Sequence, residues 1–274
     1  MPNSTGNLGA GECFLALYGQ LERYPWIPDS GIDADAFSLF YMYGNSLGWA
    51  APSHQHSENH CALWGFEDAG GSWSDYLHAS KMQDLLWVQL GLTQNSAAEG
   101  LPLAQICHCA DRVMSRTGNY TLNGIQLMTP LAVVDKRWPT SIRHIIDTAN
   151  PADRCDVVIE LDSGVGSHLV RHADEILEEF SRAASTDGLS IESTLSVHES
   201  GEPLIAEPSA LDRVAWLGES GGRILMRATI PEFTVDLGSH LIAHIARASS
   251  LAGVSGAMSI SLARSSVVDQ AALG

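Results

Sequence analysis

The order of apolar segments in the second half of the chain constrains its fold more than any other feature. Some runs are rich in β-branched residues, which predicts strands, and others repeat their apolar residues every three or four positions, which predicts helices. The expected order is strand, helix, strand, strand, helix, strand, over residues 156–162, 167–184, 189–199, 222–230, 235–249 and 256–264. This order predicts a fold of the α+β class.

The first half is expected to hold the same kinds of element in a less regular order. Strands are predicted over residues 12–22, 36–43, 61–67 and 120–134, and helices over residues 73–91 and 102–116. Ser72 is the expected N-cap of the helix over 73–91, and Gly91 is its expected stop. Residues 135–155 are basic and contain prolines, so we expect them to connect an N-terminal half, 1–134, to a C-terminal half, 156–274.

The two halves resemble each other where each ends in a helix and a strand. Residues 103–128 and 235–260 align without gaps, which places His108 opposite His240. The βαββαβ order of the second half is the pattern of ferredoxin-like domains, so the chain could be a duplicated ferredoxin-like fold. Two such units packed sheet to sheet would resemble the dimeric α+β barrel enzymes, fused here in one chain. That resemblance is one of architecture and implies no particular reaction.

Charge restricts the classes of partner. The formal charge of −17 disfavours nucleic acid and anionic membranes, because both are polyanions. In residues 1–110 the basic side chains are Arg23 and Lys81. A ligand rich in phosphate or carboxylate groups usually needs more basic partners, so we expect a small molecule that is apolar, aromatic or cationic.

The chain is expected to be a soluble cytoplasmic protein. No apolar run approaches the roughly 20 residues of a membrane helix, and residues 1–7 do not resemble a secretory signal. The cysteines number five, and an odd count without such a signal predicts reduced thiols.

A histidine-rich segment is the first candidate site. His54, His56 and His60 fall within seven residues, and alternate positions of an extended segment point to one side. Three imidazoles can bind a metal and leave one position open. We therefore expect His54, His56 and His60 as metal ligands, Glu58 as a general base and His60 as an alternative acid–base group. The expected cofactor is a divalent metal ion or haem.

Ser46 is a second candidate. The segment Gly44-Asn45-Ser46-Leu47-Gly48 follows an expected strand and resembles the nucleophile elbow of the α/β-hydrolases. The resemblance implies that Ser46 is a nucleophile. It departs from the family because Pro52 follows closely and no helix is expected after the serine.

Aromatic residues lie on both sides of the histidine-rich segment. Tyr43, Trp49 and Trp64 are the expected lining of a substrate pocket, since such pockets combine aromatic walls with a few polar groups. Core packing is the competing interpretation of these side chains.

Two further histidine pairs lie four residues apart on expected helices. His240 and His244 share one helix face, as do His168 and His172, and this spacing can hold a metal. Their neighbours fit half-buried histidines equally well, so the sequence favours a structural role for both pairs.

The sequence thus supports three readings. The first is a small-molecule enzyme with a His-rich, metal-dependent site in the N-terminal half. The second is a serine hydrolase that uses Ser46. The third is a non-catalytic binding or assembly protein that forms a homo-oligomer.

Overall fold

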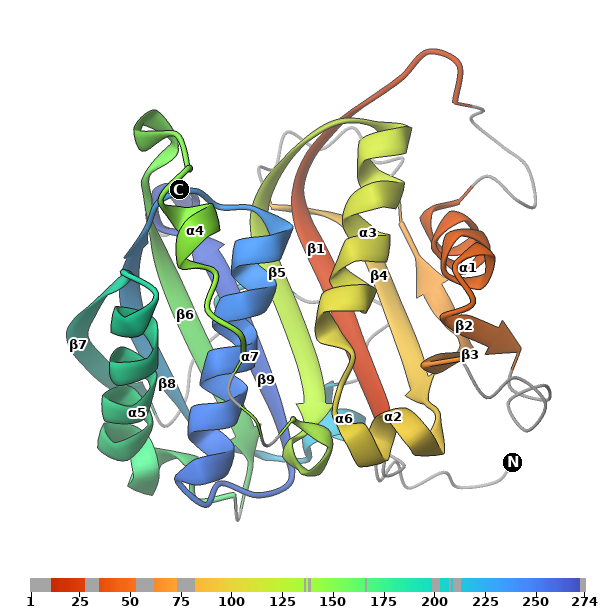
Figure 1. The fold of residues 1–274 in the computed structure, drawn as a ribbon. Coiled ribbons are helices and arrows are strands. Elements are labelled where there is room, and N and C mark those ends of the chain that lie inside the picture. Colours follow the sequence, from red (N-terminus) through yellow and green to blue (C-terminus); the bar gives the residue numbers. More distant parts are fainter. Residues whose placement is uncertain are drawn as a thin grey trace.

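The fold comes from a computed structural model and joins a large, open, mostly antiparallel sheet to a layer of helices (Figure 1). The structure describes residues 11–27, 35–52, 62–72, 82–135, 137, 139–165, 167–198, 203–206, 208 and 213–271. The α+β class expected from the sequence is confirmed.

The sheet has nine strands in the described part of the chain. They are β1 (Glu12–Arg23), β2 (Ala50–Pro52), β3 (Trp64–Gly71), β4 (Gln83–Leu92), β5 (Gly118–Pro130), β6 (Cys155–Gly164), β7 (Ser190–His198), β8 (Ser220–Ile230) and β9 (Ala257–Arg264). Their order across the sheet is β2-β3-β4-β1-β5-β9-β6-β8-β7. The pair β2–β3 is parallel, and the other neighbouring pairs are antiparallel.

The two halves of the chain meet edge to edge at the pair β5–β9. Ile125 lies opposite Leu262 there, and Leu127 lies opposite Ile260. Outward from this seam the strands follow the order β5, β1, β4, β3 on one side and β9, β6, β8, β7 on the other. The expectation that the halves pack sheet to sheet is therefore wrong. The division of the chain at residues 135–155 stays a prediction, since one sheet runs through both halves.

Helices α1, α3, α7 and α5 lie side by side over one face of the sheet (Figure 1). The helices are α1 (Ala36–Ser46), α2 (Gln94–Glu99), α3 (Leu103–Thr117), α4 (Arg143–Ile146), α5 (Ala173–Thr186), α6 (Arg213–Leu217), α7 (Val235–Leu251) and α8 (Ser265–Ala271). Short 3₁₀ turns cover Leu131–Val133, Pro151–Asp153 and Leu169–His172. No helix in the described part of the chain is long and apolar enough to cross a membrane.

Helix α7 is central to the helical layer and contacts both α3 and α5. The hydroxyl of Thr234 caps its start by accepting a hydrogen bond from the backbone N–H of Leu237, at 3.3 Å. Leu241, Ile242 and Ile245 are fully buried against the sheet and the neighbouring helices. A helix buried on several sides holds its polar side chains in fixed positions, which matters for the histidines that it carries.

The opposite face of the sheet carries a buried ionic network. Asp162 on β6 accepts a 2.8 Å hydrogen bond from Nε of Arg223 and another from Arg213 of α6. Glu160 accepts a hydrogen bond from the backbone N–H of Leu204, at 3.1 Å, and burial raises the pKa of its carboxyl group. The network ties α6 and the segment near Leu204 to the sheet.

Two elements differ from the sequence-based expectation. Residues 36–43, expected as a strand, belong to α1, whose first turn is capped by Asp35 through a 2.6 Å hydrogen bond from the backbone N–H of Ser38. The helix expected over 73–91 is wrong for 83–91, which belong to β4, and residues 73–81 lie outside the described residues.

Both errors have a physical cause. The run over 36–43 is almost uniformly apolar, so it has no period that could separate a helix from a strand. Strand β4 is covered on both faces, with Leu86 in the core beneath the helices and Trp87 against Phe14 on the other side. A strand buried on both faces loses the alternation by which strands are recognised.

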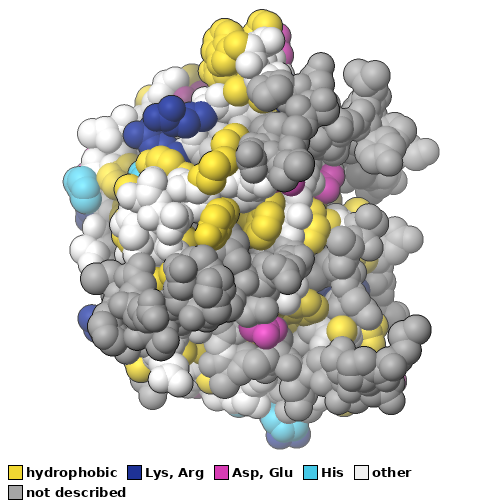
Figure 2. Space-filling model, turned by 90° about the vertical axis from the view of Figure 1, so that its right-hand side faces the viewer, with side chains coloured by type: hydrophobic (Ala, Val, Ile, Leu, Met, Phe, Trp, Pro, Cys, Tyr) yellow, Lys and Arg dark blue, Asp and Glu magenta, His cyan; other side chains and the backbone are white. Residues whose placement is uncertain are grey.

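The remaining predicted elements are present within about four residues of their expected bounds, except that α5 begins at Ala173, after a 3₁₀ turn, rather than at residue 167. They are β1, β3, β5 to β9, α3, α5 and α7. Figure 2 shows the face at the right of Figure 1, where scattered hydrophobic side chains and several basic side chains, the largest group of them at the upper left, lie among the described residues.

Candidate metal centre

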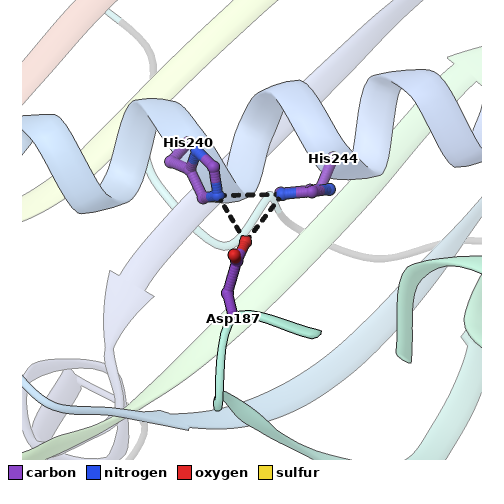
Figure 3. Close-up of side chains that lie close together, drawn as sticks. All are labelled: Asp187, His240 and His244. Atoms are coloured by element: carbon purple, nitrogen blue, oxygen red, sulfur yellow. Dashed lines mark hydrogen bonds and ion pairs between the residues drawn. The ribbon is translucent and has the colours of Figure 1, made fainter. Parts of the chain in front are cut away.

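Three buried side chains from two helices converge on one point (Figure 3). His240 and His244 lie one turn apart on α7, and Asp187 follows the last residue of α5. Oδ2 of Asp187 lies 2.7 Å from Nε2 of His240 and 3.2 Å from Nε2 of His244. The two Nε2 atoms are 2.8 Å apart. We call these three residues the His–Asp triad.

The end of helix α5 fixes the position of Asp187. Its backbone N–H donates to the carbonyl of Ala184, and the N–H of Leu189 donates to the same carbonyl. Gly188 between them has φ +82°, which glycine adopts without a steric penalty. The carboxylate therefore lies at the negative end of a helix dipole, where a positive partner is favourable.

Hydrogen bonds alone do not account for all three contacts of the triad. Nε2 of an imidazole has one in-plane position, occupied either by a hydrogen or by a lone pair. If both nitrogens donate to Asp187, two N–H groups face each other at 2.8 Å. If Nε2 of one histidine instead accepts a hydrogen bond from Nε2 of the other, the accepting nitrogen turns its lone pair toward the carboxylate oxygen of Asp187, and the two repel each other. A cation at the centre would receive a lone pair from each atom.

The distances fit three neighbouring positions around one ion. Bonds of about 2.0–2.1 Å to imidazole nitrogen and carboxylate oxygen, meeting at right angles, place adjacent ligand atoms about 2.9 Å apart. The observed separations are 2.7, 2.8 and 3.2 Å. Two histidines and one carboxylate on one face of an octahedron form a common site for transition-metal ions and leave the opposite positions open.

The protonation states also suit a cation. Burial, together with the neighbouring His240, lowers the pKa of His244 to about 4 against the opposing effect of Asp187. The pKa of Asp187 is below its usual value: burial raises it, but the Ser141 hydroxyl and the two imidazoles lower it by more. A neutral imidazole and an ionised carboxylate are the forms that bind metal.

The second carboxylate oxygen of Asp187 takes no part in the three contacts of the triad. Oδ1 of Asp187 is buried and makes no well-formed hydrogen bond with the described residues. A buried polar atom without a partner costs free energy, so such atoms call for an explanation. A bound ion or a water molecule attached to it would supply one.

Two cavities adjoin the triad, and Pro139 lines both. The larger has a volume of about 640 Å³ and includes His240 in its wall. The smaller has a volume of about 400 Å³ and includes Asp187 and His244. The triad thus adjoins two cavities that residues after β5 also line, and both volumes are within the size range of small-molecule sites.

The site residues expected in the first half are only partly described. His54, His56, Glu58 and His60 lie outside the described residues, so their roles stay predictions. The hydroxyl of Ser46 donates to the carbonyl of Tyr43, at 2.7 Å, in the last turn of α1. The strand that a nucleophile elbow needs before the serine is absent there, and the role of Ser46 also stays a prediction.

The three expected substrate-binding aromatics lie close together near His108. The ring centroid of Trp49 is 6.3 Å from that of Trp64 and 6.0 Å from that of His108. The ring of Tyr43 is 6.3 Å from that of His108. Trp64 is fully buried and belongs to the main core. The substrate-binding role of the three aromatics stays a prediction.

The environment of His108 corresponds to the triad in the other half. Helix α1 is followed by Leu47 and by Gly48, which has φ +72°. In the same way α5 is followed by Asp187 and by Gly188, which has φ +82°. In the alignment of the two halves His108 matches His240, and Arg112 matches His244. The first half therefore keeps one of the three triad residues.

Asp187 is the member of the triad that the sequence did not indicate. Its position before a glycine marks the end of a helix, but no spacing rule relates it to His240, 53 residues away. The packing of α5 against α7 brings them together. The spacing of His240 and His244 marked them as a pair able to hold a metal, although the sequence favoured a structural role for them.

Comparison with known proteins does not add to this picture. No family model matches the chain, and neither the curated proteins nor the solved structures give a match. The geometry of the triad and its cavities is therefore the basis for any functional assignment.

Proposed function

We propose that the chain is a metal-dependent enzyme that acts on a small molecule. The metal ligands are Asp187, His240 and His244, in place of the His54–His60 segment that the sequence favoured. The observation that carries the proposal is the triangle of three buried ligand atoms, whose three contacts of 2.7–3.2 Å exceed what two imidazole nitrogens can satisfy by hydrogen bonding.

The ligand set favours a first-row transition metal or zinc. Imidazole nitrogen suits Zn²⁺, Fe²⁺, Ni²⁺ and Cu²⁺, whereas Mg²⁺ and Ca²⁺ prefer sites made wholly of oxygen. Three protein ligands leave positions for water and substrate. An ion held in this way polarises a substrate oxygen or lowers the pKa of a bound water molecule, which is the chemistry of many hydrolytic and lyase reactions.

The chain's own residues would set the conditions for that chemistry. The low pKa of His244 keeps its imidazole neutral over most of the acidic range, so protons compete weakly for the metal. The fixed end of α5 holds the carboxylate, and the buried helix α7 holds the imidazoles. Such a rigid arrangement limits the rearrangement that metal binding would otherwise require.

We also propose that the two halves are a duplicated ferredoxin-like unit. The matching strand orders on either side of the β5–β9 seam and the matching ends of α1 and α5 support this. In this view the metal centre belongs to one unit, and the equivalent place in the other holds Leu47, His108 and Arg112.

The test is the metal content of the purified protein after loading with Zn²⁺, Co²⁺ or Mn²⁺ and removal of excess ion. We expect one ion per chain, and a loss of at least 90% of it in Asp187→Ala and His244→Ala. His172→Ala is the matched control, because this histidine lies outside the triad and contacts Glu175 instead. Circular dichroism and urea unfolding establish that each variant is folded.

A second arm addresses the segment that the sequence favoured. The variant His54→Ala/His56→Ala is expected to keep its metal. Loss of the ion in this variant, with retention in Asp187→Ala and His244→Ala, would move the centre to the N-terminal half. A wild-type protein that binds none of the three ions would refute the proposed metal centre.

A further inference from the structure

The larger cavity beside His240 has mostly apolar walls. Its side chains come from Leu101 before α3, from α3, β5 and α7, and from the segment between β5 and β6. The apolar part is formed chiefly by Leu101, Leu103, Leu127, Val134, Ile142 and Ile145. A cavity of about 640 Å³ with such walls accommodates an apolar molecule of moderate size.

The acidic and basic side chains that line the larger cavity do not cancel each other's charge. Arg137 is paired with Asp135 through several hydrogen bonds, the shortest 2.8 Å, so its positive charge is already compensated. Asp236, one turn of α7 before His240, also lines the cavity. The described lining residues thus carry a net negative charge, which disfavours an anionic ligand and favours a neutral or cationic one.

The smaller cavity has a different set of lining residues. Ser141, Arg182 and Thr186 line it together with Asp187 and His244. Pro139 and Ala183 line it as well, so its lining is a mixture of polar and apolar residues.

We infer, on the basis of the proposed metal centre, that the larger cavity binds the substrate and that this substrate is an uncharged or cationic molecule with an apolar body. It enters beside Asp236 and reaches the ion from the His240 side.

The test uses three probes that share a hexyl chain and differ in charge: hexyltrimethylammonium, 1-hexanol and hexane-1-sulfonate. Their dissociation constants for the Co²⁺-loaded protein are measured by calorimetry. We expect the cation and the alcohol to bind more tightly than the sulfonate. An exposed carboxylate favours a cation over a neutral group by about fivefold, and Asp236→Asn should remove that preference.

Two matched variants locate the binding. Ala243 lines the larger cavity and Ala183 the smaller, and both are half-buried alanines within helices. Ala243→Phe should weaken binding of hexyltrimethylammonium at least tenfold, whereas Ala183→Phe should leave it within about twofold. Ala104→Phe fills the larger cavity from α3 and replaces Ala243→Phe if that variant does not fold.

The two proposals fail in different ways. If Co²⁺ binds but Ala243→Phe leaves probe affinity unchanged, or if the sulfonate binds as tightly as the cation, the substrate assignment is overturned and the metal centre stands. Absence of binding by any probe also overturns it. If Co²⁺ does not bind but the probes keep the expected order and respond to Ala243→Phe, the proposed function fails and the cavity assignment stands.

Discussion

The titration of His244 should make the metal-free protein less stable as the pH falls from about 6.5 to about 4. The buried imidazole has a pKa of about 4 in the folded chain against 6.5 for an ordinary histidine. Between these values the unfolded chain binds a proton that the folded chain does not. Protonation therefore favours the unfolded state, and stability is retained above pH 6.5 and lost toward pH 4.

The size of the effect follows from the same two values. Each pKa unit corresponds to about 1.4 kcal/mol, so the complete titration from 6.5 to about 4 removes about 3 kcal/mol of unfolding free energy. The carboxyl group of Asp187 has a pKa below its usual value, so it titrates below the pH range from 6.5 to about 4 and does not contribute to this change. His244 side-chain burial is nearly complete, with 5% of its surface exposed, so solvent screening reduces the effect little.

The assay is urea unfolding at half-unit steps from pH 4.0 to 7.5, in excess chelator. The difference in unfolding free energy between wild type and His244→Gln is plotted against pH, because glutamine does not titrate. We expect this difference to change by about 3 kcal/mol across the window. His172→Gln, outside the triad, controls for histidine removal in general. A pH-independent difference would refute the reasoning that His244 is buried as the neutral form.

Two further predictions test other parts of the structure. The double variant Leu47→Asp/Arg112→His should give the first half a triad with His108 and raise the metal content from one ion to two per chain; unchanged stoichiometry would argue against the equivalence of the helix ends. Asp162→Asn should cost about 3 kcal/mol of unfolding free energy in urea, because it removes the carboxylate that accepts a hydrogen bond from the buried guanidinium of Arg223 and leaves Glu160, 3.9 Å away, as an acidic neighbour. The exposed Asp156→Asn is the control, and an equal loss in both would contradict the buried network.

The sequence alone determined the class of fold and much of its element order. Segments with one apolar face, such as α5 and α7, carry a period that identifies them, and the alternation of elements in the second half follows from it. The i, i+4 spacing of His240 and His244 likewise identified a pair on one helix face, because the helical period is a local property.

Tertiary structure decided the rest. Whether residues 36–43 become a helix and 83–91 a strand depends on what covers both of their faces, which no local period encodes. The joining of the halves through β5 and β9 depends on which strand edges meet. Asp187 becomes part of a site only because α5 packs against α7 and brings its end to His240. Local patterns identify helices, strands and spaced pairs, whereas a site built from distant segments exists only once the chain is packed.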